Sequence, residues 1–183
     1  MAPNGRKVFS VLSVWRAYAR IFSAMLDQSE KISLDRTDAA ILRILQRDAA
    51  ATLDAIAAVA NLSTATAWRR IRALEAAGVI AGRATLLDPA KAGWSLCAFA
   101  DVTLKDHSVG NRRAFERFVE AAEEVMECHS LAGARDYLLK IRAPDIAAYE
   151  AFLMERLLTH PAVASAASSF SLRELKFTTA LPV

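Results

Sequence analysis

The chain has few residues suited to a metal site, a disulfide framework or a membrane anchor. Its two cysteines, Cys97 and Cys128, lie far apart in apolar stretches, and its three histidines, His107, His129 and His160, match no metal-ligand spacing. We therefore interpret the cysteines as reduced core thiols and His129 as a packed residue, and we predict no metal and no cofactor. No apolar run approaches the roughly 18 residues that span a bilayer, which indicates a soluble, cytoplasmic protein.

Positive charge is concentrated in the first half of the chain. Residues 1–33 hold five Lys and Arg against two acids, residues 34–83 seven against five, and residues 84–183 eleven against thirteen. The three parts together give the formal net charge of +3. This asymmetry favours an N-terminal part that binds a polyanion, joined to a neutral or acidic C-terminal domain.

Residues 1–33 form an extension that differs from the rest of the chain. They mix apolar and basic residues at spacings compatible with a short basic amphipathic helix. Arg16 and Arg20 interrupt the apolar stretch, which argues against a secretory signal. Met25 offers an alternative translation start, in which case residues 1–24 are not native. Both interpretations remain open.

Residues 34–83 predict three helices in a winged-helix-like helix-turn-helix domain. The first helix should end near Asp48, the second should end at Asn61, and Gly78 should cap the third at its carboxyl end. The predicted caps at the amino ends of the three helices are Asp35, Thr52 and Ser63.

The third helix separates an apolar face from a face of hydroxyls and arginines. At about 100° per residue, the buried face contains Ala67, Ile71 and Leu74. The opposite side contains Ala65, Thr66 and Arg69, with Trp68 and Arg72 on one flank and Arg70 on the other. Repulsion among the arginines is offset when they bind a polyanion and counterions leave. We therefore predict that this helix reads the DNA major groove, the alternative being a solvated face.

The second half of the chain predicts a βαββαβ domain. Strands are expected at 95–104, 125–132, 136–142 and within 165–179, with one amphipathic helix around 115–122 and another at 145–158. The second helix should direct Ile146, Tyr149, Leu153 and Leu157 inward. The fold class is thus α+β: a helix-turn-helix domain and a ferredoxin-like domain with both helices on one sheet face.

The other face of this sheet is expected to lack a cover within the chain. We place Leu96, Ala98, Ala100 and Val102 on it, and such a face is too apolar to remain in water. The sequence therefore predicts a homodimer through the C-terminal domain. A change of alternation also predicts a β-bulge near Arg173 and Glu174 that bends the last strand toward the partner.

Four segments of the chain together form a specific pattern: LDRTDAAILRILQRDAA (34–50), LSTATAWRRIRALEAAGVIAGRATLLDP (62–89), VMECHSLAGARDYLLKI (125–141) and ELKFTTALP (174–182). With these segments the chain resembles the Lrp/AsnC, or feast/famine, transcriptional regulators. The resemblance implies a DNA-binding domain (34–83), a hinge strand or linker (84–95), and an effector-binding and dimerisation domain (96–183). It also implies dimers that assemble further, often to octamers, and that hold small effectors, commonly amino acids.

The predicted DNA contacts all come from the start and middle of the third helix. We expect Thr64, Thr66 and Arg69 to approach base edges, and Ser63, Arg70 and Arg72 to hold phosphates. Two positions depart from the family pattern, since Thr64 replaces a common proline and Trp68 a common aliphatic residue. Trp68 either packs within the domain or stacks on a base. Ser63 either caps the helix alone or also contacts DNA, and Arg70 could pair with an acid of its own domain instead of DNA.

The family's Gly-x-x-Asp-Tyr pattern is present as Gly133, Asp136 and Tyr137, and the resemblance implies that these residues lie beside the effector. Arg135 or backbone N–H groups could hold a carboxylate, and Asp136 an ammonium group. In the alternative interpretation Asp136 caps a turn, Tyr137 belongs to the core and Arg135 is solvated.

Two other functions stay open beside a sequence-specific regulator. One is an architectural DNA-binding protein without a ligand. The other is an enzyme similar to the sirohaem decarboxylases, which share the domain order. We predict a regulator rather than an enzyme, because the sequence has no compelling acid/base or haem-ligand cluster.

Overall fold

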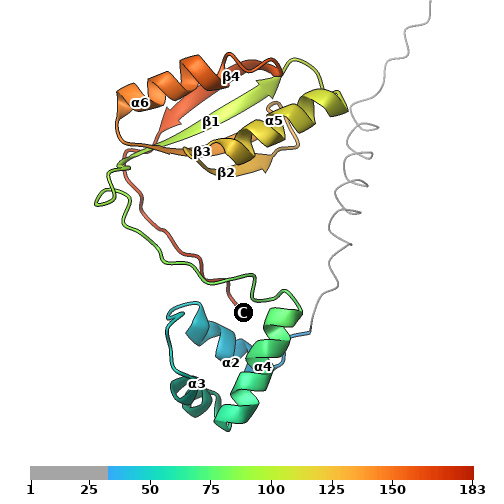
Figure 1. Cartoon of the computed structure of the whole chain (residues 1–183), viewed down its shortest axis with the longest axis vertical. Helices are drawn as coiled ribbons and strands as arrows, with labels where there is room; N and C mark the ends of the chain where they lie inside the picture. Colours follow the sequence, from blue (N-terminus) through green and yellow to red (C-terminus); the bar gives the residue numbers. More distant parts are fainter. Residues whose placement is uncertain (1–32) are drawn as a thin grey trace, which may run out of the picture. The chain divides into compact units, whose positions relative to one another are not determined.

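The computed structural model describes residues 33–183, which form two compact units (Figure 1). One unit contains residues 33–85 together with 178–183, and the other spans Leu86–Phe177. The end of the chain therefore belongs with the helix-turn-helix rather than with the βαββαβ domain. The helix and the alternative start expected in the N-terminal extension lie outside the described residues.

The first unit contains three helices, and each begins at the cap that the sequence predicts. Asp35, Thr52 and Ser63 each accept a hydrogen bond from the backbone N–H three residues later, which satisfies a donor with no partner inside the helix. The first helix ends at Leu45, close to the expected Asp48. The helices are α2 (Arg36–Leu45), α3 (Leu53–Ala60) and α4 (Thr64–Ala76).

Left-handed residues end α3 and α4, as predicted. Asn61 has a φ of 54°, and the Leu62 N–H donates to the Ala57 carbonyl at 2.8 Å. Gly78 has a φ of 73°, and the Val79 N–H donates to the Leu74 carbonyl at 3.0 Å. These bonds satisfy carbonyls at the two helix ends and turn the chain sharply. At Asn61 the sharp turn lets α4 follow α3 after a short connection.

The core of the first unit confirms the predicted buried face of α4. Ala67 and Ile71 of α4 pack with Ile41 of α2 and with Ile56 and Ala57 of α3. Because these side chains fix the rotation of α4 about its own axis, the opposite side of the helix must face solvent.

The tail of the chain is bonded to α2. The Gln46 side chain accepts a hydrogen bond from the Leu181 N–H at 2.6 Å and donates one to the Leu181 carbonyl at 3.2 Å. The Arg43 guanidinium donates to the Val183 carbonyl at 2.7 Å. The first unit is therefore built from two stretches of chain that are distant in the sequence.

The second unit has the predicted βαββαβ order. Its antiparallel sheet has the strand order β2-β3-β1-β4. Phe115 of α5 and Tyr149 of α6 belong to the same buried cluster as Leu139 of β3, so both helices cover one sheet face (Figure 1). The elements are β1 (Leu96–Leu104), α5 (Val109–Ala121), β2 (Val125–Ser130), β3 (Tyr137–Ala143), α6 (Ile146–Ala151), η1 (Phe152–Leu157) and β4 (Val163–Phe170).

The expectation that Leu96, Ala98, Ala100 and Val102 face an uncovered side of the sheet is wrong. The last three are completely buried in the cluster beneath the helices, and Leu96 packs against that cluster. The alternation of apolar and polar residues assigns the side chains of a strand to two faces. It does not predict which of these faces the helices of the same chain will cover. The chain's own helices thus account for the apolar row.

The opposite face of the sheet is mixed in character. Phe99 is 37% exposed there, and the residue opposite it in the register is Lys140. Lys140 pairs with Glu127 at 2.7 Å, and Arg142 pairs with Glu174 at 3.0 Å. The open face therefore does not by itself demand an apolar partner.

The last strand lies earlier in the chain than expected. It ends at Phe170, so Arg173 and Glu174 follow it outside any strand and the bulge predicted there is wrong. The ladder irregularities instead lie beside Leu104 in the β1–β4 pair and between Val125 and Glu127 in the β2–β3 pair. Alanines and serines dominate β4, and they carry little of the hydrophobic alternation that marks a strand.

The helix expected over 145–158 changes geometry halfway. An α-helical start, α6, continues as the π-helix η1, in which the Leu158 N–H donates to the Leu153 carbonyl at 2.9 Å. Tyr149 and Leu157 point inward as predicted, whereas Ile146 is 62% exposed. Phe152 also belongs to the core, because it lies three residues after Tyr149 and therefore on the same side of the helix.

The segment expected as a hinge strand or linker, 84–95, has no strand partner within the described chain. It contains a turn in which the Trp94 N–H donates to the Pro89 carbonyl at 2.7 Å and Gly93 has a φ of 86°. The structure therefore describes this segment as a connection.

Two predictions about single residues are also wrong. Cys128 is exposed rather than part of the core, and His129 is 58% exposed, with its Nε2 3.4 Å from Glu127. Both belong to β2, an edge strand whose side chains are mostly exposed.

Candidate nucleic-acid interface and ligand loop

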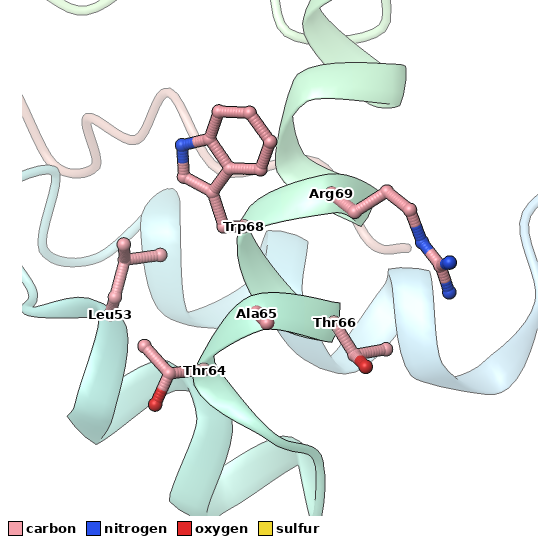
Figure 2. A pocket seen from close by; sticks show the side chains of 6 residues that line it. All are labelled: Leu53, Thr64, Ala65, Thr66, Trp68 and Arg69. Atoms are coloured by element: carbon pink, nitrogen blue, oxygen red, sulfur yellow. The ribbon is translucent and has the colours of Figure 1, made fainter.

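A hollow lies over the first turns of α4 (Figure 2). Leu53 comes from the start of α3, so the arrangement of the two helices forms the hollow. Thr66 and Arg69 lie on the far side of α4 from Leu53 and Trp68 (Figure 2). The hollow holds about 530 Å³ and is lined by Leu53, Thr64, Ala65, Thr66, Trp68 and Arg69.

Hydrogen bonds within the domain orient the hydroxyl groups of this region. Ser63 Oγ accepts from the Thr66 N–H at 3.2 Å and lies 2.8 Å from Thr66 Oγ1. Thr64 Oγ1 donates to Asp54 Oδ1 at 2.9 Å. Ser63 is therefore a helix cap, and the Thr64 hydroxyl is engaged with α3.

Arg70 pairs with two acids of its own domain. Its Nη1 lies 2.7 Å from Asp35 Oδ2 and 2.8 Å from Asp38 Oδ1. The Asp38 N–H and the Arg70 guanidinium hold the pKa of Asp35 below its usual value, and the two carboxylates raise the pKa of Arg70. Arg70 thus ties α4 to the start of α2, which favours the alternative that the sequence left open for it.

We expect Arg70→Ala to lower the free energy of unfolding of the helix-turn-helix unit by at most about 1 kcal/mol, because ion pairs this close to solvent are screened. A double-mutant cycle with Asp38→Ala, followed by urea unfolding, isolates the pair energy. Because the pKa of Asp35 is lowered, the contribution of the Asp35–Arg70 pair should be fully present above about pH 4, the ordinary aspartate range, and be lost as the pH falls further. Additive effects of the two substitutions would show that the pair contributes nothing.

Trp68 and Arg72 form a contact on the flank of α4. The Arg72 guanidinium carbon lies 5.6 Å from the centroid of the Trp68 ring, and Nη1 lies 3.1 Å from Glu75 Oε2. Trp68 nevertheless remains 51% exposed. The indole is therefore held in place by α4 itself while part of its surface faces the hollow.

Arg69 differs from the other two arginines of α4. It is exposed, and among residues 33–183 no carboxylate lies within ion-pair distance of its guanidinium. Its side chain is directed away from the core (Figure 2). Arg69 is thus the α4 arginine best placed to meet an external anion.

The ligand loop predicted around Gly133 connects β2 to β3. Asp136 uses its carboxylate locally, since Oδ2 accepts from the Leu104 N–H at 2.7 Å and Oδ1 lies 3.5 Å from His107 Nδ1. Arg135 is exposed and lies 3.4 Å from Thr103 Oγ1. Asp136 therefore secures the end of β1, while Gly133 and Arg135 face solvent.

Tyr137 belongs to the core of the second unit. Its ring centroid lies 4.8 Å from that of Phe115, and its hydroxyl donates to Glu116 Oε1 at 3.5 Å. Burial raises the pKa of Tyr137, and the neighbouring Glu116 charge adds to the increase. These contacts give Tyr137 a structural role whatever else it binds.

Sequence reasoning missed four residues at these two sites. Leu53 of α3 lines the α4 hollow, and Asp54 of α3 accepts the hydrogen bond of Thr64. His107 contacts Asp136, and Glu116 contacts Tyr137. The position of Leu53 follows once α3 and α4 are packed as a helix-turn-helix. The other three contacts depend on side-chain placement that no local pattern predicts.

Residues 33–183 offer neither a metal-binding cluster nor a membrane-spanning helix. In the part of the chain from residue 33 onward, no cluster of three or more His, Cys, Asp or Glu side chains is arranged to hold a metal ion. Within the same residues, no helix combines the length and apolar character needed to cross a membrane.

Comparisons with known proteins agree with this architecture. A family model described as winged helix-turn-helix DNA-binding matches residues 34–81, and one described as Lrp/AsnC ligand binding domain matches residues 97–181. The DNA-binding transcriptional activator DecR of Escherichia coli (strain K12) is 34% identical over 150 residues, covering 82% of this chain and 99% of DecR.

Two further relatives cover similar shares. The glutamate uptake regulatory protein of Zymomonas mobilis is 40% identical over 150 residues, covering 82% of this chain and 91% of that protein. The crystal structure of a Neisseria meningitidis transcriptional regulator in complex with L-methionine superimposes with a TM-score of 0.79 at 37% identity, covering 82% of this chain and 97% of that one. With both domains matched and nearly whole relatives covered, the chain belongs to the Lrp/AsnC family of DNA-binding transcriptional regulators with a ligand-binding domain.

Proposed function

We propose that this regulator reads duplex DNA with the exposed side of α4 and changes its DNA binding when an amino acid occupies the second unit. The observation that carries the DNA part is the orientation of α4. Its apolar residues are buried against α2 and α3, which leaves Arg69 exposed beside the hollow. A helix presented in this way fits the major groove.

The proposed roles follow from the contacts of each side chain. Arg69 and Thr66 contact base edges, with Arg69 suited to the two acceptors of guanine. Arg72 and the amino end of α4, capped by Ser63, contact phosphates. Arg70 acts as a positioning residue, because its bonds to α2 hold α4 in place.

Genomic footprinting with and without added amino acids tests the proposed function. A sequence-specific regulator protects a limited set of promoter sites, and an amino-acid effector changes that protection. Equal protection of random and promoter DNA at physiological salt would instead indicate an architectural protein. The direction of the effect distinguishes repression from activation at each promoter.

The effector is proposed to be an amino acid bound beside the loop of Gly133, Arg135, Asp136 and Tyr137. Support comes from the match to a ligand-binding domain and from the Neisseria meningitidis relative solved with L-methionine. In this loop the exposed Arg135 is available to a carboxylate, since its planar guanidinium can hold both oxygens. Asp136 and Tyr137 would shape the site while keeping their structural bonds.

Thermal unfolding in the presence of each of the twenty amino acids tests the effector. A ligand at a hundred times its dissociation constant should stabilise the protein by about 2.7 kcal/mol. Arg135→Ala should reduce that stabilisation, whereas Arg113→Ala, an exposed arginine of α5, serves as the control of equal charge change. A shift that is the same in both variants and the wild type would remove Arg135 from the site.

A homodimer that assembles into higher oligomers is proposed as the active form. The support comes from exposed apolar side chains after β4, where Leu172 is 101% and Leu175 80% exposed. Side chains of this kind favour burial against a second copy. Sedimentation velocity tests the assembly: a monomer across the working concentration range would contradict it.

The proposal describes a cytoplasmic regulator rather than an enzyme. Its support is that the relatives compared above are named as regulators, and that regulators of this kind act where the chromosome is. Absorbance after incubation with an iron tetrapyrrole tests the sirohaem-decarboxylase alternative, for which a Soret shift is expected.

A further inference from the structure

The hollow over α4 has an apolar side within an otherwise cationic and polar surface. Leu53 and Trp68 lie on either side of the space above Thr64 (Figure 2). Arg69 lies on the other flank of the same helix, and the Arg72 guanidinium lies over the Trp68 ring. An apolar hollow bordered by arginines is suited to bind a polyanion that presents an apolar group to it.

The side chains that form the apolar side are held in fixed orientations. The Thr64 hydroxyl is engaged by Asp54, and its methyl group is directed to the side of Leu53 and Trp68 (Figure 2). Arg72 holds the Trp68 ring, and Leu53 packs against the domain core. A preorganised surface of this kind loses little side-chain freedom when it is covered.

The chemistry of the DNA major groove identifies the occupant. Each base pair presents hydrogen-bonding groups there, and the thymine C5-methyl is the apolar group among them. The hollow is an open depression on the surface of the domain (Figure 2), so the edge of a base pair can approach it directly. We propose that Leu53, Thr64 and Trp68 form a receptor for a thymine methyl, so that each half-site contains one thymine read by hydrophobic contact. The inference rests on the proposed reading of DNA by α4.

Replacing each operator thymine in turn by uracil tests the proposal, since this change removes only the methyl group. We expect binding to fall about fourfold at one thymine of each half-site, which corresponds to about 0.8 kcal/mol for one buried methyl-sized group. Other uracil substitutions should leave the affinity unchanged. Fluorescence anisotropy on the full-length protein at a fixed salt concentration gives the ratio of the two affinities.

Four variants locate the methyl contact. Trp68→Ala and Thr64→Ser should abolish the preference for thymine over uracil, because each removes part of the apolar side. Thr64→Val retains a methyl while losing the bond to Asp54, and should preserve the preference. Val59→Ala, which shortens a 70% exposed side chain of α3 outside the hollow, is the control and should also preserve it.

The outcomes separate this inference from the proposed function. If the wild type binds its operator but no uracil substitution weakens binding, the methyl receptor is wrong while the reading of DNA by α4 stands. A preference that survives in both Trp68→Ala and Thr64→Ser would place the methyl contact elsewhere and overturn the inference. If the wild type binds no duplex, the proposed function itself fails.

Discussion

Arg69→Ala is expected to weaken binding to a cognate operator by about 1–3 kcal/mol, the usual worth of a side chain that contacts a base through two hydrogen bonds. The reason is that Arg69 is exposed beside the α4 hollow and has no ion-pair partner among the described residues. Binding to random DNA should fall much less, so the ratio of cognate to random affinity should shrink.

Arg47→Ala is the matched control for this measurement. Arg47 is exposed at the end of α2, outside the hollow, and its replacement removes the same charge from the same domain. It should leave the cognate-to-random ratio unchanged. If Arg69→Ala lowers both affinities equally, Arg69 contacts phosphate rather than a base edge.

Phe115→Ala is expected to lower the free energy of unfolding of the second unit by about 3–5 kcal/mol, the range for removing a buried aromatic side chain. Phe115 is completely buried, and its ring contacts Tyr137, Phe118 and His160. Removing the Phe115 ring leaves a cavity, because the three neighbouring rings can fill only part of the space. Differential scanning calorimetry measures the change in the transition of this unit.

Phe99→Ala provides the control with the same change of side chain. Phe99 lies on the open face of the sheet and is 37% exposed, so its removal leaves no enclosed cavity. We expect a loss well below that of Phe115→Ala. Similar losses for the two variants would mean that the open face is buried in the assembled protein, which would itself support the proposed oligomer.

The helix-turn-helix could be predicted in detail because its signals are local. The caps act over three residues, and the left-handed ends need only Asn61 and Gly78, so short stretches of sequence suffice. The period of α4 likewise separates its buried and exposed sides without knowledge of the rest of the chain.

The sheet was predicted in its order but not in the direction of its faces. The alternation of β1 is the same whether Ala98 and Ala100 face the chain's own helices or a partner. Only the packing of α5 and α6 decides between these two arrangements. The apolar row of β1 therefore lies beneath the chain's own helices and gives no support to a dimer.

Side-chain partners at the sites were the least predictable part. The bonds of Arg70 to Asp35 and Asp38 join residues 35 and 32 positions apart. The bond of Asp136 to the Leu104 N–H also spans 32 positions. Such contacts depend on tertiary packing, so the residue types indicated charge and hydrogen-bonding capacity but not the partner.

The bonds between Gln46 and Leu181 join residues 135 positions apart. In an unfolded chain the closure of so long a loop costs conformational entropy, and folding of the intervening βαββαβ unit removes most of that cost in advance. We therefore expect the tail to dock onto α2 more readily once the second unit has folded.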